Sequence, residues 1–560
     1  MSAAGAPRFT RLVISQLNHA SMPYELKLSS HASRYDGGDG AVLYLNRSDV
    51  VAAWDVLPGI LSELELLPTI PALTKPIAPG VGLAEDTGGG ESFGMQRCRW
   101  LSEGIVRAWE IGQRSLADRM QVVAETWAEA GIAFEQPYLN PGSLDVSDLA
   151  SPPLPTLCQS LPAPSDFLEC ATSIGHALVS SAIWHGERCT WLGLTEASSG
   201  TASFNAVPPT LYDGTAGVAL FLAELNAAMP DATVRATALG ALRQSLATAD
   251  RAASPVGIGL YIGLPGIVWS VARVSHLLDE PELLDAARAL LARLPDMIEQ
   301  PHESDLLSGS AGAIVALLRL REWFTDPALL ATAIRLGDYL IACAEIDGRG
   351  WRWRSTAHPR VLPLTGFSHG ASGIAYAFVS LFVATNDVRY REAALGAFAW
   401  ERGRYIANGN VWPDYRDVAS AAVRRGATLP SAAFWCHGAP GIALTRLVGW
   451  KGLGDDRLRD EAIAALTATR QAVGQAIGDP ADSLCLCHGL AGNALILQHG
   501  ADVLDDSSLR DASRAAFASL IERHILADLE SSPGLMTGLS GVGLACLRAA
   551  GYPATDVLSV

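Results

Sequence analysis

Two short runs decide how this chain folds: Trp435-Cys436-His437-Gly438 and Leu486-Cys487-His488-Gly489. Each run continues through two more residues to a second glycine, Gly441 or Gly492. A Cys-His pair at an irregular bend before a helix is well placed to bind a soft metal. Two thiolates and one imidazole suit zinc with a fourth position left open, which is typical of a catalytic site. Two pairs in the same register favour this interpretation over buried free cysteines beside ordinary histidines.

The Gly-x-x-Gly step in these runs recurs seven times in the second part of the chain. The paired glycines are Gly214/Gly217, Gly263/Gly266, Gly309/Gly312, Gly370/Gly373, Gly438/Gly441, Gly489/Gly492 and Gly538/Gly541. Each step leads into an apolar segment, and the 46 to 68 residues between successive first glycines leave room for a second helix. This pattern predicts seven helical hairpins.

The segments that follow the glycines are apolar almost all round, as in Val218–Leu225. A helix of this kind is buried on every side. We therefore expect the hairpins to close into an α/α toroid, with the glycine-started helices inside. The Gly-x-x-Gly bends would then gather at one mouth and bring polar residues from distant repeats together. The residues just before the first glycines are Asp213, Ile262, Ser308, His369, His437, His488 and Thr537.

Composition sets the broad class of protein. The chain has 560 residues, of which 49% are hydrophobic, and a net charge of −17, which makes a nucleic-acid partner unexpected. No apolar run is long enough to span a bilayer and no signal peptide is apparent, so we expect a soluble, cytoplasmic protein with no membrane partner. Nine scattered cysteines argue against a disulfide framework.

The first part of the chain differs from the repeats. Residues 1–140 mix strand-like and helix-like segments, such as Ala41–Asn46 and Leu101–Ala130, and predict a smaller α+β domain. The glycine-punctuated stretch Lys75–Asp86 is compatible with a phosphate-holding turn or a plain loop. Six prolines in residues 141–165 predict a linker, so the toroid is expected over residues 166–560.

Five motifs in order make the second part resemble the LanC family of lanthipeptide cyclases, especially the cyclase half of LanM-type synthetases. They are Leu211-Tyr-Asp-Gly-Thr-Ala-Gly217, Ser368-His-Gly-Ala-Ser-Gly373, Trp435-Cys-His-Gly-Ala-Pro-Gly441, Leu486-Cys-His-Gly-Leu-Ala-Gly492 and Thr537-Gly-Leu-Ser-Gly541. The resemblance implies an α/α toroid with catalytic zinc held by Cys436, Cys487 and His488. Cys485 lies close by but breaks register with Cys436.

The same resemblance implies that a substrate thiolate adds to a dehydroamino acid and forms a thioether ring. His369 would protonate the resulting enolate. Asp213 lies where the family has an acidic residue near the metal, although it could instead cap the following helix. His437 could be a second acid or a histidine whose hydrogen bonds are satisfied by the backbone, and we favour a supporting role. Stand-alone cyclases have an arginine shortly before the first zinc cysteine; here that function is missing or is supplied by Arg424 or Arg425.

The first 140 residues resemble a HopA-type effector domain, which is similar to phosphothreonine lyases and occurs in class V lanthipeptide pathways. The resemblance rests on residues 71–86, Gly90–Gly94 and Gln136–Gly142. It implies a catalytic base and a catalytic acid. Lys75 is the candidate base, with Lys27 as the rival. His31 is the candidate acid, with His19 as the second choice. Three arginines could clamp the phosphate: Arg34, Arg97 and Arg99. Each could also be an ordinary surface residue.

Together these features predict a bifunctional lanthipeptide synthetase. It would eliminate phosphate from phosphoserine or phosphothreonine in a precursor peptide and cyclise cysteines onto the products. No kinase motif is apparent, so a separate kinase would act in trans, and the precursor's leader segment would bind at an unidentified place. One alternative makes residues 1–140 a peptide- or partner-binding module. A second is a non-catalytic zinc scaffold with four protein ligands. An α/α-toroid glycosidase would need two facing carboxylates, and the rim offers only Asp213.

Overall fold

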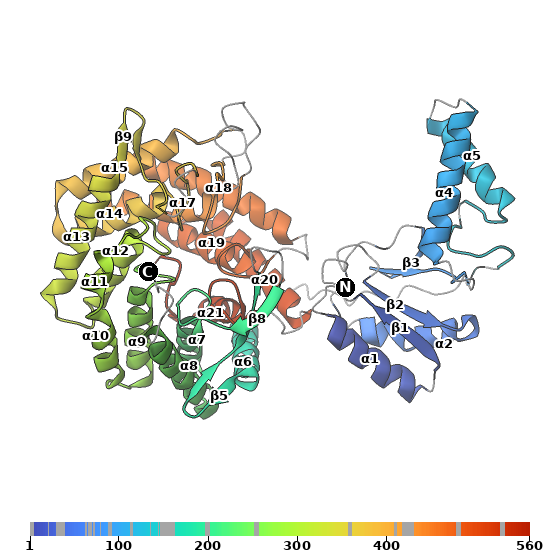
Figure 1. Ribbon diagram of the computed structural model, residues 1–560, viewed down its shortest axis with the longest axis horizontal. Coiled ribbons are helices and arrows are strands. Elements are labelled where there is room, and N and C mark those ends of the chain that lie inside the picture. Colours follow the sequence, from blue (N-terminus) through green and yellow to red (C-terminus); the bar gives the residue numbers. More distant parts are fainter. Residues whose placement is uncertain are drawn as a thin grey trace. The chain divides into compact units, whose positions relative to one another are not determined.

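A computed structural model describes the protein. The residues it describes are 5–20, 22–29, 40–61, 64, 66, 70, 73–78, 80–87, 92–111, 116–134, 136–143, 145, 163–196, 202–250, 257–356, 361–407, 411–416, 431–477, 483–526 and 532–559. The chain forms two compact units: residues 1–159 with 526–530, the N-terminal unit, and residues 160–525 with 531–560, the C-terminal unit (Figure 1). Among the helices formed by these residues, none is long and apolar enough to cross a membrane.

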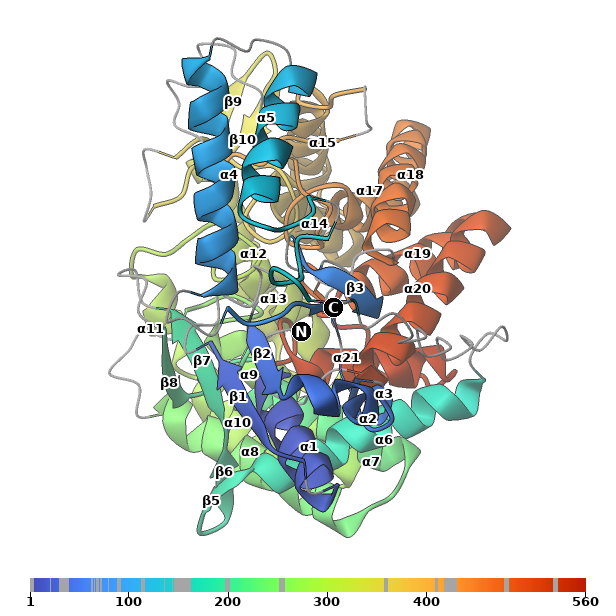
Figure 2. The same cartoon turned by 90° about the vertical axis from the view of Figure 1, so that its right-hand side faces the viewer.

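The N-terminal unit is a small α+β structure. Its elements are α1 (Ala6–His19), β1 (Tyr24–Leu28), β2 (Ala41–Leu45), the 3-10 helix η2 (Arg47–Asp49), α2 (Val50–Trp54), α3 (Leu57–Leu61), β3 (Lys75–Ala78), β4 (Val81–Leu83), α4 (Phe93–Glu110) and α5 (Leu116–Glu129). Apolar residues of α1 recur at helical spacing and pack with Ile60 of α3, below the antiparallel pair β1–β2. Helices α4 and α5 lie side by side in both views (Figure 1 and Figure 2).

Two expectations for this unit need correction. The helical pattern of Leu101–Ala130 belongs to two helices, because α4 ends at Glu110 and α5 begins at Leu116. The stretch from Lys75 is a strand hairpin, in which Lys75 lies opposite Leu83, rather than a loop. Alternation of side chains across this hairpin buries Ile77 and leaves its neighbours partly exposed.

The C-terminal unit is mostly helical. Its elements are α6 (Pro164–Ser181), β5 (Ile183–His185), β6 (Arg188–Thr190), β7 (Leu192–Glu196), β8 (Ala202–Ala206), α7 (Thr215–Ala228), α8 (Ala232–Asp250), α9 (Leu264–Leu278), α10 (Leu283–Leu291), α11 (Leu294–Ile298), α12 (Ser310–Leu320), α13 (Pro327–Cys343), β9 (Glu345–Asp347), β10 (Gly350–Arg352), α14 (Ala371–Thr385), α15 (Val388–Arg402), α17 (Ala439–Leu453), α18 (Asp456–Ile477), α19 (Leu490–Leu504), α20 (Ser507–Leu526) and α21 (Leu539–Ala549).

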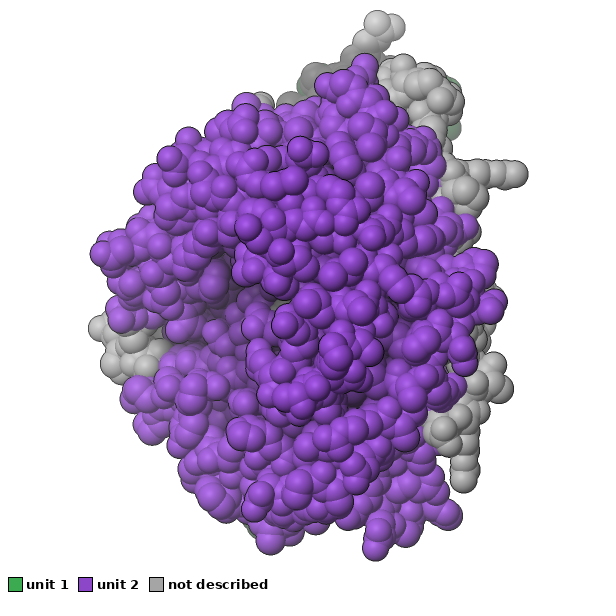
Figure 3. Space-filling view, turned by 90° about the vertical axis from the view of Figure 1, so that its left-hand side faces the viewer, with its two compact units in different colours: residues 1–159, 526–530 green, residues 160–525, 531–560 purple. Residues whose placement is uncertain are grey.

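The predicted α/α toroid is confirmed by the contacts between these helices. The glycine-started helices contact one another in the order α7, α9, α12, α14, α17, α19 and α21, and α21 returns to α7. Their central turns are buried almost all round, as in Thr215–Leu225 of α7. Helices α8, α10, α13, α15 and α18 each pack against the preceding inner helix. Figure 1 shows the helices following one another around the unit, and Figure 3 shows its surface, hollowed near the middle.

The last hairpin of the toroid joins the two ends of the unit. Inner helix α21 packs against α6, the first helix of the unit, and the Sγ atoms of Cys170 and Cys546 lie 3.5 Å apart across this contact. A helix from the start of the unit therefore pairs with one from its end. This pairing covers one side of α21 with α6.

The second glycine of each Gly-x-x-Gly step is required by close backbone packing. A Cβ at Gly492 would lie 1.8 Å from the carbonyl oxygen of Leu486, and one at Gly441 would lie 2.1 Å from that of Trp435. The other five repeats show the same approach. Gly438 has a φ of +107°, which L side chains rarely adopt. The repeated glycines therefore permit the tight bend that begins each inner helix.

The boundary and the strands differ from what the sequence predicts. Helix α6 begins at Pro164, because a proline in the first turn lacks an N–H that would have no helical partner there. The Asp166 carboxylate accepts the N–H of Ala163 at 2.8 Å and completes this helix start. Three strand hairpins, β5–β6, β7–β8 and β9–β10, interrupt a region that the sequence describes as helical.

Candidate functional site

A closed ring of main-chain hydrogen bonds holds the rim of the toroid. The amide two residues before the first glycine of each repeat donates to the equivalent carbonyl of the next repeat. The bonds are Tyr212 to Tyr261 (2.9 Å), Tyr261 to Leu307 (3.1 Å), Leu307 to Ser368 (3.1 Å), Ser368 to Cys436 (3.0 Å), Cys436 to Cys487 (3.4 Å), Cys487 to Met536 (2.8 Å) and Met536 to Tyr212 (2.8 Å). This ring makes Cys436 and Cys487 direct neighbours, although they come from different repeats.

The thiols of Cys436 and Cys487 form a buried, hydrogen-bonded pair. The bond from Cys487 lowers the pKa of the Cys436 thiol to about 7; burial opposes this shift and the charge of Arg416 reinforces it. The same bond, together with burial, raises the pKa of Cys487. The Tyr212 hydroxyl donates to Cys487 Sγ at 2.8 Å. One thiol of the pair is therefore poised to ionise near neutral pH, as soft metal ligands must.

The third predicted ligand, His488, is turned toward another cysteine. A hydrogen bond with Cys485 raises the pKa of the His488 imidazole, and Cys485 Sγ also accepts the His488 amide at 3.4 Å. In the part of the chain that the structure describes, no three His, Cys, Asp or Glu side chains are arranged to hold a metal ion. The donor types still fit zinc, because three buried thiols and an imidazole lie on two adjacent rim bends.

His369 lies on the neighbouring bend and is held by an aspartate. Its Nδ1 lies 2.5 Å from Oδ2 of Asp305, and Oδ1 of Asp305 accepts bonds from the amide and hydroxyl of Ser308. Burial works to lower the pKa of His369, but the bond and charge of Asp305 outweigh burial and raise it. The carboxylate therefore favours a protonated imidazole and fixes the ring by one nitrogen.

His437 and His369 are neighbours, and their pKa values shift in opposite directions. Their rings are stacked with centroids 5.8 Å apart. Burial and the nearby positive charge of Arg416 lower the pKa of His437 to about 3. His437 is therefore neutral at physiological pH, which suits a structural or hydrogen-bonding role better than that of an acid.

Asp213 lies on the other side of the cysteine pair along the ring. Its Oδ1 bonds to the Thr537 hydroxyl, and burial raises its pKa. Helix α7 begins at Thr215, its N-cap position is Gly214, and no side chain caps it, so capping does not explain Asp213. The bends at Ile262 and Ser308 separate Asp213 from His369 in the order of the ring.

Three residues of this site were not singled out from the sequence as functional. Asp305 could have been found four residues before Gly309, in a polar stretch that precedes a Gly-x-x-Gly step. Arg416 exerts its charge on Cys436, His437 and His369, while Arg424 and Arg425 lie outside the described residues. Tyr212 shares the ring position of the two cysteines, but sequence alone does not show where its hydroxyl points.

In the N-terminal unit, Lys75 is engaged in a polar cluster. Its Nζ lies 2.9 Å from both carboxylate oxygens of Asp145, and the Tyr138 hydroxyl donates to the same carboxylate at 3.0 Å. The ammonium also lies 5.7 Å from the centre of the Tyr138 ring. A lysine acting as a base would have to leave this ion pair, so Asp145 would control its availability.

The structure describes two of the three arginines expected to bind phosphate, and their contacts differ. Arg97 has no exposed surface, and its guanidinium donates to the carbonyl oxygens of Pro137 and Leu139 at 2.8 Å. Arg97 therefore holds the loop after α5, and its geometry argues against a phosphate clamp. Arg99 is exposed and pairs with Glu103 at 3.3 Å. Arg34 lies outside the described residues.

Of the remaining lyase candidates, the structure describes His19 and Lys27. His31, the expected acid, lies outside the described residues. His19 is exposed in the last turn of α1, and the rival base Lys27 is exposed on β1. The structure brings neither of them into the cluster around Lys75 and Asp145.

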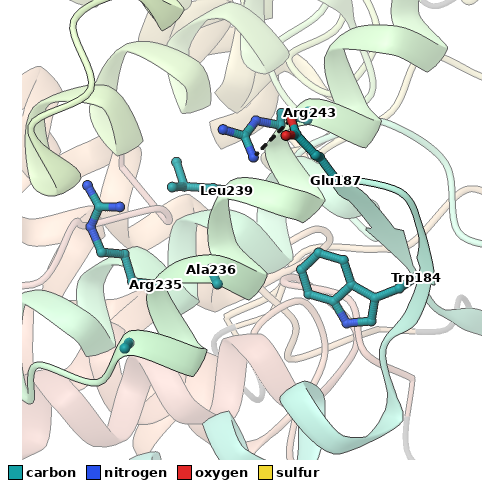
Figure 4. A pocket seen from close by; sticks show the side chains of 7 residues that line it. Trp184, Glu187, Arg235, Ala236, Leu239 and Arg243 are labelled. Atoms are coloured by element: carbon teal, nitrogen blue, oxygen red, sulfur yellow. Dashed lines mark ion pairs between the residues drawn. The ribbon is translucent and has the colours of Figure 1, made fainter.

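A surface pocket of about 400 Å³ lies between the β5–β6 hairpin and α8 (Figure 4). Its side chains include Trp184, Glu187, Arg235 and Arg243, and none of the rim residues. Arg243 lies 3.8 Å from Glu187, and Arg235 pairs with Glu280 at 2.7 Å. The residues that line this pocket include no thiol and no imidazole.

Comparison with known proteins agrees with this geometry. Residues 205–553 match the lanthionine synthetase C-like protein family, and residues 1–139 match the HopA1 effector protein family. The lacticin 481/lactococcin biosynthesis protein LcnDR2 of Lactococcus lactis subsp. lactis is 24% identical over 379 residues, covering 64% of this chain and 38% of that protein. The chain thus spans well under half the length of this relative. A solved nisin cyclase is similar in fold, with a TM-score of 0.50 and 18% identity, covering 62% of this chain and 90% of that one.

Proposed function

The chain belongs to the lanthionine synthetase C-like family, and from this premise we propose that its C-terminal unit is a lanthipeptide cyclase. It joins a cysteine thiol of a precursor peptide to a dehydroalanine or dehydrobutyrine of the same peptide. One observation carries the proposal: the closed hydrogen-bond ring brings the thiols of Cys436 and Cys487 into contact and sets His369 on the next bend. The site thereby combines soft metal donors with a proton donor.

We assign Cys436, Cys487 and His488 as the ligands of a zinc ion. Bound zinc would lower the pKa of a substrate thiol and supply a thiolate at neutral pH. His488 would have to turn from Cys485 toward the thiol pair to take part. The Tyr212 hydroxyl, which donates to Cys487 Sγ, would orient that ligand.

The proton that completes the addition would come from a histidine of this chain, His369. Addition of the thiolate to the β-carbon leaves an enolate, which needs a proton at its α-carbon. His369, whose protonated form Asp305 stabilises, would donate that proton. Arg416 supplies positive charge beside His369 and Cys436, which would stabilise the developing enolate oxygen. His437 would support the stacked His369 ring, and Asp213 would act on the far side of the site near His488.

The match of residues 1–139 to the HopA1 effector protein family supports a second activity. We propose that the N-terminal unit removes phosphate from phosphoserine or phosphothreonine and so makes the alkene that the cyclase consumes. Lys75 would remove the α-proton after release from Asp145, and Arg99 would bind phosphate. His31 and Arg34 stay in the proposal as candidate acid and phosphate ligand. A kinase acting in trans would supply the phosphorylated precursor. In the alternative, this unit only binds the peptide or a partner.

Mass spectrometry separates these activities. The purified full chain is incubated with a phosphorylated, cysteine-containing model peptide, and a thiol-alkylating reagent is added at the end. We expect the peptide to lose phosphoric acid and to resist alkylation. Elimination removes its phosphate, and cyclisation consumes its cysteine thiol. A chemically dehydrated peptide tests the cyclase alone. Full alkylation of that peptide in the presence of zinc would overturn the cyclase proposal, and retention of phosphate would overturn the lyase.

A further inference from the structure

We propose that Cys485 is a fourth ligand of the same metal, bound in the absence of substrate and displaced by the thiol of the peptide. This inference rests on the proposed function, since it needs a metal at the rim. It departs from the expectation that Cys485 is only a bystander that breaks register with Cys436.

Cys485 lies on the same bend as His488, the proposed imidazole ligand. It precedes His488 by three residues, the spacing of paired ligands in many zinc sites. Its Sγ accepts the amide N–H of His488 at 3.4 Å, which holds the sulfur over the same turn. N–H groups directed at a sulfur stabilise its thiolate, the form that binds metal.

The contacts of Cys485 also distinguish it from a packing cysteine. It is only 4% exposed, and its sulfur has the His488 imidazole as a partner. Cys189 is also buried, but its Sγ acts as a thiol donor to the carbonyl oxygen of Thr237 at 3.4 Å. Cys189 therefore provides a matched buried control.

The four donors form two adjacent pairs, Cys436 with Cys487 and Cys485 with His488. Cys487 connects the two pairs, because its thiol is hydrogen-bonded to that of Cys436 and it lies between Cys485 and His488 in the sequence. A set of three thiolates and one imidazole is a complete zinc shell. These four residues would hold the ion, and its binding would replace the two hydrogen bonds.

Four protein ligands would close the site until a peptide arrives. Exchange keeps the charge constant: the substrate thiol loses its proton, its sulfur takes the position that Cys485 leaves, and Cys485 takes the proton. Cys485 would therefore protect the metal between turnovers and return when the thioether product, a poor ligand, departs.

X-ray absorption at the zinc edge of the full-length protein tests this inference. Three sulfurs and one nitrogen are expected for the wild type and for Cys189→Ala, and two sulfurs for Cys485→Ala. Zinc affinity of Cys485→Ala is expected to fall by about 10- to 100-fold. Two sulfurs in the wild type, unchanged by Cys485→Ala, would overturn the role of Cys485 and leave the cyclase proposal intact. A wild type that binds no zinc would overturn the metal of the proposed function itself.

Displacement is tested with a model peptide that contains selenocysteine, because selenium is distinguishable from sulfur at the zinc edge. Wild-type protein with excess peptide should change from three sulfurs to two sulfurs and one selenium. Persistence of three sulfurs without selenium would overturn displacement. A site that stays closed in this way would favour the non-catalytic scaffold. Circular dichroism of each variant shows whether it is folded, and Cys485→Ser provides a smaller change of shape.

Discussion

The main-chain N–H of Met536 donates to the carbonyl oxygen of Tyr212 at 2.8 Å and joins the last repeat to the first. The two residues are 324 positions apart, yet they occupy equivalent places two residues before a repeat glycine. Each of the other six residues in the ring makes the same bond to the next. The ring sets the order of side chains around the mouth of the toroid. A substitution in one bend should therefore shift the side chains on the adjacent bends.

Cys436→Ala should abolish stoichiometric zinc binding and thioether formation. Loss of one thiol removes a ligand and also the hydrogen bond to Cys487. Zinc content is measured by mass spectrometry of the metal, and cyclisation with a dehydrated peptide. Cys343→Ala is the control, because Cys343 is exposed and lies outside the ring. Zinc content equal to wild type in Cys436→Ala would remove this residue from the ligand set.

Asp305→Asn should shift the pH dependence of cyclisation. Asp305 raises the pKa of His369, and an acid catalyst loses activity as the pH rises through its pKa. Loss of the carboxylate charge lowers that pKa, so the alkaline limb should move to lower pH. His369→Asn should lower kcat by about 100-fold or more.

The pH profile of kcat with a dehydrated peptide measures this effect. Asp338→Asn is the control, because Asp338 is an exposed carboxylate that pairs with Arg389 at 3.0 Å. An unchanged alkaline limb in Asp305→Asn would mean that His369 does not act as the acid under its control.

Gly492→Ala should destabilise the C-terminal unit. The added Cβ would lie 1.8 Å from the Leu486 carbonyl oxygen, and the bend beside Cys487 would have to shift. The expected cost is about 1–3 kcal/mol, with loss of zinc affinity. Gly474→Ala in α18 is the matched control, because its Cβ meets nothing within 4 Å. That change should stabilise the helix by about 0.5–1 kcal/mol. Thermal unfolding of both variants measures the contrast.

Arg97→Ala should destabilise the N-terminal unit. The carbonyls of Pro137 and Leu139 would lose their donors, at an expected cost of about 3 kcal/mol. Arg99→Ala should leave the unfolding temperature unchanged and weaken binding of a phosphopeptide. A stable Arg97→Ala variant with weakened phosphopeptide binding would restore Arg97 as a phosphate ligand.

Lys75→Ala should slow phosphate loss from a phosphopeptide by about 100-fold or more if Lys75 is the base. Lys27→Ala is the companion variant, because Lys27 is the rival candidate and lies exposed on β1. Phosphate release and cyclisation are followed separately in each protein. Elimination that survives both substitutions would mean that neither lysine is the base.

The sequence by itself determined the toroid. The Gly-x-x-Gly period and the all-round apolar segments are local properties, and a helix apolar on every side can only lie inside. The Cys-His-Gly runs also pointed to Cys436, Cys487 and His488, and the family resemblance pointed to His369, before any contact was known. The start of α6 at Pro164 and the strand hairpins were less accessible, because local propensity is weak at the ends of elements.

Only the tertiary structure decided which groups meet. Asp305 reaches His369 across 64 positions, and Tyr212 reaches Cys487 across 275. The turn of His488 toward Cys485 and the burial of Arg97 depend in the same way on how neighbouring segments pack. The hydrophobic periodicity of a segment indicates which of its faces is buried. These contacts depend instead on how the ring closes and on where each side chain points, and no local sequence pattern encodes either.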